Sequence, residues 1–470
     1  MAPRTLNSTQ DIDELTRRMK EEELLSLSLG INSDWHSGEA KKRKRKDAGD
    51  RKLMEVRDEM MRVSRSKRHG MKDGKGVELI NMLISSASTV IAGDNAGTTI
   101  EMIGELYRNS SFSGDPVQRL TAYFADALAA RVSTIESPVY RAIMAAPSPE
   151  EEFAAFVELY RASPYYQFAH FTANQVIMEV FEDAELKNKR NSLHVVDFNV
   201  SNGFQWPSLI QSLSDKATRS RPIFLRVTGF AQSSGELKET EMRLASFAKG
   251  CSNLVFEFDG VLRGCRPSEL KIKKNETLVV NLMFYLQTLR SNIEISDMLE
   301  CISFLNPSAV VVVEKDGDGG SGGQRSRSFL SRFIESLHYF AAMFDSLDDC
   351  LPAESARRLS IERDHLGMEI KRVVTTEKAE EDEHVGNEGM EVWKGRIMES
   401  IGFQRVKMSS RALSQAKLLL MIKSHCNCSS MEYGNGGGFR VFERDEGMAL
   451  SLGWQNRHLI TASTWSPMLS

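Results

Sequence analysis

The sequence predicts an α/β fold, in which a mostly parallel sheet follows a layer of helices and a polar N-terminal tail. Three observations support this prediction. The segment from Leu193 to Leu213 changes from a buried-strand pattern to a glycine-containing turn and then to a helix. After it, short apolar runs alternate with helical patterns, which is typical of a parallel sheet covered on both faces. Before it, apolar residues recur with helical spacing from Val77 onward.

Residues 1–75 are predicted to be a disordered basic tail, because their apolar residues are too sparse to bury a core. Between Lys41 and Lys75 there are 15 Lys or Arg and 6 Asp or Glu, a net of +9, and since the whole chain carries −4, the remainder carries about −13. The densest run predicts nuclear import and comprises Lys41, Lys42, Arg43, Lys44, Arg45 and Lys46. The alternative is a solvated charge run that keeps the tail extended.

A short leucine alternation lies upstream of this run, after three glutamates, at Leu25, Leu27 and Leu29. In an extended segment, alternate leucines lie on one side of the chain and can dock into a groove of a partner. The alternative has equal weight and is an amphipathic helix from Asp11 to Leu29.

Helices are predicted over residues 76–185, the N-terminal cap. The first ends at Gly93 and presents one apolar face, made of Leu79, Ile80, Leu83, Ile84, Ala87, Val90 and Ile91. A second covers about 98–108, and a third starts at Asp115 and Pro116, an N-cap followed by proline at the first helical position. Helical patterns at 153–160 and 168–181 continue the layer. Most of these apolar faces are expected to be core.

Residues 190–470 are predicted to form the α/β core. Strands are expected at 193–198, 223–227, 254–258, 277–281 and 309–314. Helices are expected at 205–213, 236–249, 295–305 and 329–347. A closing set of strands, antiparallel at the edge, is expected at 416–423, 438–443 and 459–463. Trp454 and Trp465 are expected to fill the core beside the last strand.

The candidate ligand cleft is the turn after the first strand, because open α/β sheets bind ligands at the carboxyl ends of their strands. Its candidate residues are Asp197, Asn199, Asn202 and Gly203. A dinucleotide or S-adenosylmethionine loop needs several glycines, and this turn has one. The second strand runs into Thr228, Gly229 and Phe230, without an acid for ribose hydroxyls. We therefore expect no cofactor, and expect Asp197 to bond backbone amides or cap the following helix.

Other catalytic and metal-binding patterns are weak. The GGSGG stretch at 319–323 fits a nucleophile elbow formally, but it lies in a loose Gly/Ser-rich loop. His425, Cys426 and Cys428 lack a second ligand pair, and six scattered cysteines suit free thiols in a reducing compartment. No apolar stretch approaches the ~18 residues that span a bilayer. We expect no catalytic residue, no metal and no membrane insertion.

Several blocks of the chain resemble the plant GRAS family of transcriptional regulators. HVVDF, at His194 to Phe198, is similar to the central motif of that family, usually written VHIID. Further similar blocks lie on either side of it, in the same order as in the family, at 113–131, 163–182, 225–230, 333–347 and 452–465. Five long blocks in order are far more specific than one short motif. The chain departs from the family at 377–396, where an acidic run stands in place of an arginine-valine-glutamate-arginine motif.

The resemblance implies a methyltransferase-like, Rossmann-type core with an N-terminal helical cap, together forming a GRAS domain over residues 76–470. It also implies a nuclear transcriptional regulator, not an enzyme, whose partners are DNA-binding transcription factors, zinc-finger factors among them, and other GRAS proteins. The leucine alternation resembles a motif that recruits plant corepressors.

Contact with DNA is expected to be indirect, since the folded part is acidic and shows no helix-turn-helix, basic zipper or zinc finger. Homodimers and heterodimers both stay open. The alternative function is a methyltransferase-like enzyme or a small-ligand receptor that uses the cleft at the end of the first strand.

Overall fold

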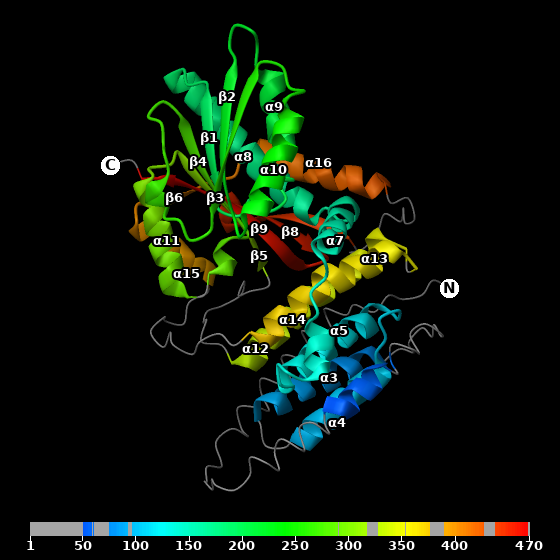
Figure 1. Cartoon of the computed structure of the whole chain (residues 1–470). Helices are drawn as coiled ribbons and strands as arrows, with labels where there is room; N and C mark the ends of the chain where they lie inside the picture. The colour runs from blue at the N-terminus through cyan, green and yellow to red at the C-terminus, as the bar shows by residue number, and fades with distance from the viewer. Residues whose placement is uncertain are drawn as a thin grey trace. The chain divides into compact units, whose positions relative to one another are not determined.

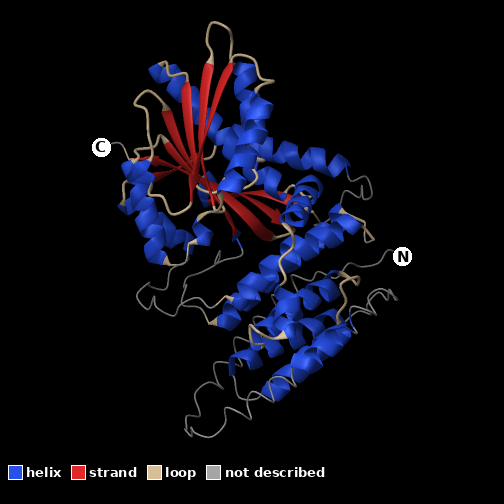
Figure 2. Ribbon diagram, in the orientation of Figure 1, coloured by secondary structure: helices blue, strands red, loops and turns tan. Residues whose placement is uncertain are grey.

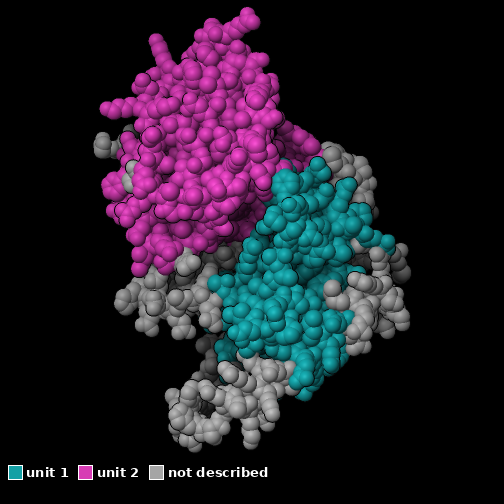
Figure 3. Space-filling model, viewed as in Figure 1, with its two compact units in different colours: residues 1–163, 326–379 teal, residues 164–325, 380–470 magenta. Residues whose placement is uncertain are grey.

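The computed structural model describes residues 50–58, 60, 75–92, 96–289, 291–316, 328–352, 354–376, 390–426 and 438–468. The chain forms two compact units, one from residues 1–163 and 326–379 and the other from 164–325 and 380–470 (Figure 3). In the described residues, the first unit consists of helices, whereas the second holds a sheet with helices on both faces (Figures 1 and 2). The α/β class predicted from the sequence is confirmed.

The first unit contains every helix predicted between Val77 and Tyr160. These are α3 (Lys75–Ala92), α4 (Ala96–Asn109), α5 (Pro116–Val132) and α7 (Pro149–Ala162), and the predicted helix at 329–347 joins them as α12 (Phe329–Cys350). The unit is completed by α6 (Pro138–Met144), α13 (Ala356–Ser360), the π-helical segment η4 (Ile361–Leu366) and α14 (Gly367–Thr375). Asp115 caps α5 as predicted, because its carboxylate accepts a hydrogen bond from the Gln118 amide at 3.0 Å.

Helix α5 is the buried centre of this unit, since all its residues from Arg119 to Ala130 are buried. Phe124 packs edge-on against Phe333 of α12, with ring centroids 5.2 Å apart. The Arg119 guanidinium donates to Glu362 at 3.0 Å and to Asp348 at 2.6 Å. A helix buried on all sides needs neighbours on all sides, which explains why residues 326–379 return to this unit.

One part of the predicted disordered tail is a helix of the first unit. Residues 50–58 and 60 are helical, and within them Leu53 and Met60 are buried. Arg57 donates to the buried carboxylate of Asp126 twice, from Nε at 2.6 Å and from Nη2 at 2.9 Å. The prediction of a disordered tail up to residue 75 is therefore wrong for this stretch. The apolar residues of this helix are few, but a charge-assisted hydrogen bond joins its Arg57 to Asp126, 69 positions away, and adds to their contacts.

The second unit is built on one nine-stranded sheet. Its strands are β1 (Ser192–Asp197), β2 (Ile223–Ala231), β3 (Leu254–Leu262), β4 (Thr277–Met283), β5 (Ala309–Lys315), β6 (Phe403–Val406), β7 (Phe439–Arg444), β8 (Ala449–Trp454) and β9 (Arg457–Pro467). Their order is β3-β2-β1-β4-β5-β9-β8-β7, and β6 pairs with β9. Strands β1 to β5 are parallel, and those beyond β5 pair antiparallel. The order reverses at β1, so the predicted cleft lies at a topological switch point.

Helices lie on both faces of this sheet (Figure 2). One face carries α8 (Tyr165–Asn188), α9 (Trp206–Lys216) and α10 (Ser234–Ala248). On the other face, α11 (Asn292–Phe304) and α15 (Met390–Ser400) pack apolar side chains such as Leu299 and Met398 against Val280 and Val310. The link between β3 and β4 contains only the short 3-10 helix η1 (Pro267–Glu269). No described helix therefore crosses from β3 to β4.

Two predictions about the second unit need correction. Residues 416–423 are not a strand but part of helix α16 (Ser410–Cys426), in which Ala412, Ala416 and Leu419 form one buried face at helical spacing. The predicted boundary between cap and core at 185–190 also differs from the two compact units. Helix α8 belongs to the sheet unit, and residues 326–379 belong to the helical unit. Trp454 and Trp465 are buried as predicted.

Candidate functional site

The candidate cleft lies where β1 ends and α9 begins. Asp197 is the last residue of β1, and its turn continues through Asn199 and Asn202 to Gly203. Asp197 is 1% exposed and Gly203 is buried, whereas Asn199 and Asn202 are partly buried. The structure thus holds the four predicted residues in one turn, in which the acid points into the protein.

Two groups of the protein donate hydrogen bonds to Oδ1 of Asp197. This atom accepts from the Asn199 backbone amide at 3.1 Å and from Nδ2 of Asn281 at 3.1 Å. Burial raises the pKa of Asp197 to about 6, although both hydrogen bonds favour the charged form. The backbone contact agrees with the prediction that the acid bonds amides of its own turn. The Asp197 carboxyl group is therefore held in the interior by groups of the protein itself.

A chain of buried amides continues from Asp197 to helix α8. Asn281 donates to Oε1 of Gln205 at 3.0 Å, and Gln205 donates to Oδ1 of Asn174 at 3.1 Å. Asn174 in turn donates to the Gln205 carbonyl and to Oγ of Ser208, both at 2.8 Å. Sequence reasoning missed this network, and the one available signal was an asparagine inside the apolar run of β4. Connected buried amides of this kind hold β1, β4, α8 and α9 in one arrangement.

Two glycines near the turn allow close approach, but the groups that approach them belong to the protein. Gly203 has a φ of +71°, and a Cβ there would lie 2.8 Å from Cγ2 of Thr240 in α10. At the end of β2, a Cβ on Gly229 would lie 2.9 Å from Cβ of Val200. The space that a nucleotide-binding turn keeps for phosphate or ribose is used here by Thr240 and Val200.

Aromatic rings fill the region beside the same strand ends. Phe198 stacks on Phe230 with centroids 4.8 Å apart and an interplanar angle of 7°, and its centroid lies 5.3 Å from that of Tyr285. The Arg263 guanidinium lies 5.8 Å from the Tyr285 centroid and donates to Oδ1 of Asn199. Asn199 is thus engaged by a cation of the protein itself, and the ends of β1 and β2 are packed.

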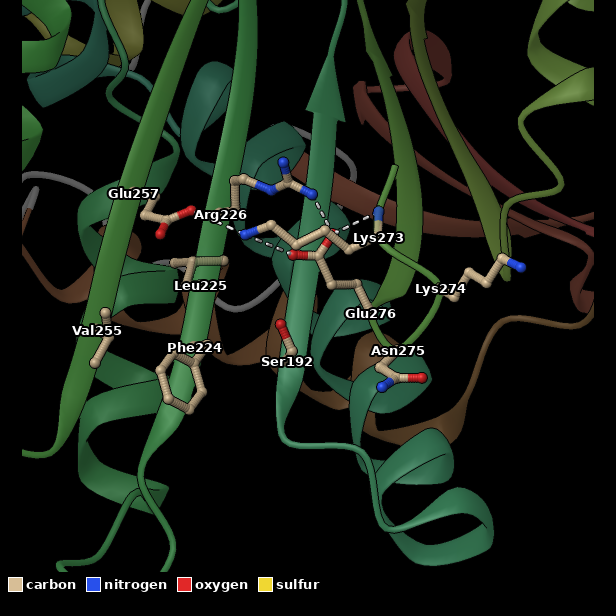
Figure 4. A pocket seen from close by; sticks show the side chains of 10 residues that line it. All are labelled: Ser192, Phe224, Leu225, Arg226, Val255, Glu257, Lys273, Lys274, Asn275 and Glu276. Atoms are coloured by element: carbon tan, nitrogen blue, oxygen red, sulfur yellow. Dashed lines mark hydrogen bonds and ion pairs between the residues drawn. The ribbon is translucent and has the colours of Figure 1, made fainter. Parts of the chain in front are cut away.

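A pocket of about 280 Å³ lies at the opposite, amino-terminal ends of β1, β2 and β3 (Figure 4). Its lining is partly apolar and partly charged and consists of Ser192, Phe224, Leu225, Arg226, Val255, Glu257, Lys273, Lys274, Asn275 and Glu276. The short link between β3 and β4 leaves this face without a crossover helix. Sequence reasoning missed the pocket, because four separate segments contribute to it.

The charged groups beneath this pocket are bonded to one another. Arg226 donates to Glu276 and, at 3.3 Å, to Nδ1 of His194. Burial, and then the charge of Arg226, lower the pKa of His194 to about 3, so the imidazole is neutral. Since Nδ1 accepts, Nε2 carries the proton and donates to Oγ1 of Thr228 at 2.8 Å. The network thus joins three buried polar groups of neighbouring segments, and its histidine is neutral near neutral pH.

Several predicted site residues lie outside the described residues. These are the nuclear-import run at 41–46, the leucines at 25, 27 and 29, the Gly/Ser-rich stretch at 319–323, Cys428 and residues 377–389 of the acidic segment. Within the described ranges, no group of three His, Cys, Asp or Glu side chains is placed to hold a metal ion. None of the described helices has both the length and the apolar character needed to cross a membrane.

Comparison with known proteins gives a consistent result. A model of the GRAS domain family matches residues 79–466. Scarecrow-like protein 23 of Arabidopsis thaliana is 32% identical over 83% of this chain and 89% of its own length. Protein SCARECROW of Ipomoea nil is 32% identical over 84% of this chain, which spans 47% of that protein. The crystal structure of SCL7 from Oryza sativa superimposes with a TM-score of 0.63 at 29% identity, covering 82% of this chain and 99% of that one.

Proposed function

This chain belongs to the GRAS domain family of plant transcriptional regulators, and on that basis we propose that it acts in the nucleus through protein–protein interaction. The observation that carries the proposal is the packed carboxyl end of β1. Asp197 is buried among amides, and Val200 lies against Gly229 where a cofactor would approach. A Rossmann-type sheet filled in this way is suited to be a rigid scaffold for partner surfaces.

The partners that we propose are DNA-binding transcription factors, with zinc-finger factors among them, and other GRAS proteins. The charge of the chain supports indirect contact with DNA. Outside the basic segment 41–75 the chain carries a net charge of about −13, whereas a DNA-binding surface neutralises phosphates with Lys and Arg. A partner that holds the DNA would remove this electrostatic conflict.

The N-terminal segment adds two proposals that rest on the sequence. The basic run from Lys41 to Lys46 would bind a nuclear-import receptor, and Leu25, Leu27 and Leu29 would recruit a corepressor. Each can be tested separately in the full chain. Alanine at the six basic positions should move a fluorescent fusion out of the nucleus, and alanine at the three leucines should weaken repression without moving it.

A tethering experiment tests the main proposal. The full chain is fused to a heterologous DNA-binding domain, and transcription is measured from a reporter that carries the operator of that domain. We expect a several-fold change with the fusion and none with the unfused chain, because regulation needs a protein that holds the DNA. Sequence-specific, nanomolar binding of the purified chain alone to a duplex would refute indirect action.

One variant in the same assay distinguishes this proposal from the alternative. The alternative is an enzyme or small-ligand receptor that uses the turn at Asp197 and Gly203. Asp197→Asn keeps an oxygen at the position that accepts from Asn199 and Asn281. The scaffold proposal predicts unchanged reporter regulation by this variant. Loss of regulation in a variant that is still folded would favour a ligand role for the carboxylate.

A further inference from the structure

Strand β3 forms one outer edge of the sheet. It pairs with β2 in an unbroken parallel register from Leu254 opposite Ile223 to Leu262 opposite Ala231, and no other described strand pairs with it. An outer strand presents a row of backbone N–H and C=O groups that another strand can use. Proteins commonly protect such edges with short strands, prolines or bulges. Strand β3 is nine residues long, contains no proline and keeps its register throughout.

The exposed face of β3 carries an ordered row of side chains. Val255, Glu257 and Asp259 alternate along the strand and therefore lie on the same face. Val255 is 44% exposed, and the side chains of Glu257 and Asp259 are 57% and 60% exposed. Figure 4 shows Val255 and Glu257 on the strand that borders the pocket, with Phe224 on its neighbour. This face is accessible because η1 replaces a crossover helix between β3 and β4.

The two carboxylates are only weakly engaged by the protein. Glu257 lies 3.5 Å from Nζ of Lys273, whose side chain is 60% exposed, and Asp259 lies 3.9 Å from Nη1 of Arg226. The pair of Glu257 with Lys273 is exposed and contributes little to stability. Arg226 is buried but also pairs with Glu276, so a partner cation can replace its 3.9 Å contact with Asp259 and leave it paired.

The charges of Glu257 and Asp259 indicate which kind of strand can pair with the outer edge of β3. If β3 of a second copy paired antiparallel with β3 about a two-fold axis, the two acidic pairs would lie side by side, and like charges on neighbouring strands destabilise the pairing. A segment with basic side chains at alternate positions is attracted to β3, because each of its cations lies beside an anion. The charges therefore oppose self-association and favour a basic partner.

We propose that the outer edge of β3 binds an extended, basic segment of a partner protein as an additional strand. Backbone hydrogen bonds to β3 would supply the affinity, and alternate Lys or Arg side chains beside Glu257 and Asp259 would supply the specificity. The aliphatic part of a further Lys or Arg side chain on the same face of the segment would cover Val255. This inference stands apart from the proposed regulatory function and holds for any partner with such a segment.

The first experiment uses the full chain and a synthetic peptide of twelve residues that alternates valine and lysine. Binding is followed by fluorescence anisotropy at physiological salt, which screens non-specific attraction between exposed charges. A peptide that alternates valine and glutamate is the matched control. We expect saturable binding of the basic peptide and at least about tenfold weaker binding of the acidic one. No saturable binding of the basic peptide, or equal binding of the two, would overturn the proposal.

Charge reversal in the protein localises the site. The variant Glu257→Lys with Asp259→Lys should weaken binding of the basic peptide by at least about tenfold. The control variant Glu239→Lys with Glu241→Lys makes the same change in net charge on exposed residues of α10 and should leave binding within about twofold. Equal losses in the two variants would mean that the peptide responds to overall charge, and the proposed edge would be wrong.

Methylation of the peptide backbone distinguishes strand addition from charge contact alone. In an added strand, only every second N–H points toward β3. N-methylation of either all valines or all lysines leaves the charges of the peptide unchanged. We expect one pattern to weaken binding at least about tenfold and the other to have a much smaller effect. Equal effects of the two patterns would show that no strand is added.

Discussion

Burial changes the protonation of the Asp197 carboxyl group. Its side chain is 1% exposed, and burial raises its pKa from 3.8 to about 6. Between these values the folded state binds a proton that the unfolded state has released. The free energy of unfolding therefore falls as pH rises from about 4 to about 6, by up to about 3 kcal/mol for a shift of about two units.

The substitution Asp197→Asn should remove this dependence. An asparagine oxygen can still accept from Asn199 and Asn281, while the variant has no carboxylate to ionise in the interior. We expect the free energy of unfolding of the variant, measured by chemical denaturation at several pH values, to stay flatter between pH 4 and 6 than that of the unsubstituted chain. The exposed control Asp215→Asn should keep the original slope. Identical slopes for the unsubstituted chain and Asp197→Asn would show that this carboxyl group does not titrate as described.

Contacts between residues close in the sequence could be predicted, whereas contacts between residues far apart in the sequence could not. Asp115 was identified as an N-cap because its partner, Gln118, is three positions away. The partners of Asp197 include Asn281, 84 positions away, and the network then reaches Asn174 in α8. Nothing in the spacing of the chain indicates that these amides meet, because their contact depends on the order of the strands in the sheet.

At the scale of elements, the helical residues 50–58 and 60 contribute buried contacts to the helical unit. Deletion of residues 1–49 removes none of them, whereas deletion of residues 1–74 removes buried Leu53 and Met60 and leaves the Asp126 carboxylate buried without its guanidinium partner. Breaking a buried ion pair in this way typically costs about 3–5 kcal/mol. We expect the longer deletion to lower the Tm of the helical unit by more than about 5 °C and the shorter one to leave it nearly unchanged.

Thermal unfolding followed by circular dichroism checks this expectation. The full-length variant Arg57→Met serves as the matched control, since it removes the guanidinium and retains the chain. Its Tm should lie between those of the two deletions. If both deletions melted at the same temperature, the contacts of residues 50–60 would contribute nothing to the unit.

The misassigned element at 416–423 shows the limit of short apolar runs. The sequence LLLMI suits a buried strand as well as a helix, and periodicity over five residues does not separate the two. The structure forms a helix because Ala412, Ala416 and Leu419 recur on one face, which packs beside α8. The strands at 438–443 and 459–463 were predicted correctly, as β7 and β9.

At the scale of the whole molecule, the order of elements was more predictable than their grouping. Alternating strands and helices indicated the parallel part of the sheet, and the structure confirms β1 to β5 in that arrangement. The return of residues 326–379 to the helical unit was not predicted, because it depends on contacts such as that of Arg119 with Glu362, which are 243 positions apart. Such contacts result from packing around α5, and no local pattern in the sequence indicates them.

The sheet offers different surfaces at its two ends. The carboxyl ends of β1 and β2, where related folds hold a cofactor, are closed by Phe198, Val200 and Phe230. The amino-terminal ends of β1 to β3 and the outer edge of β3 are open to solvent. The protein-binding role that we propose requires a surface of the second kind. We therefore infer that side chains of the protein itself occupy the position at which a Rossmann-type sheet binds a cofactor.

Calorimetric titration of the full-length chain with S-adenosylmethionine and with its demethylated product tests that claim most directly. We expect no saturable heat with either compound, in a sample shown to be folded and monodisperse. Saturable binding in the micromolar range would contradict it, because such affinity requires space beside Asp197 and Gly203 that Thr240 and Val200 now occupy.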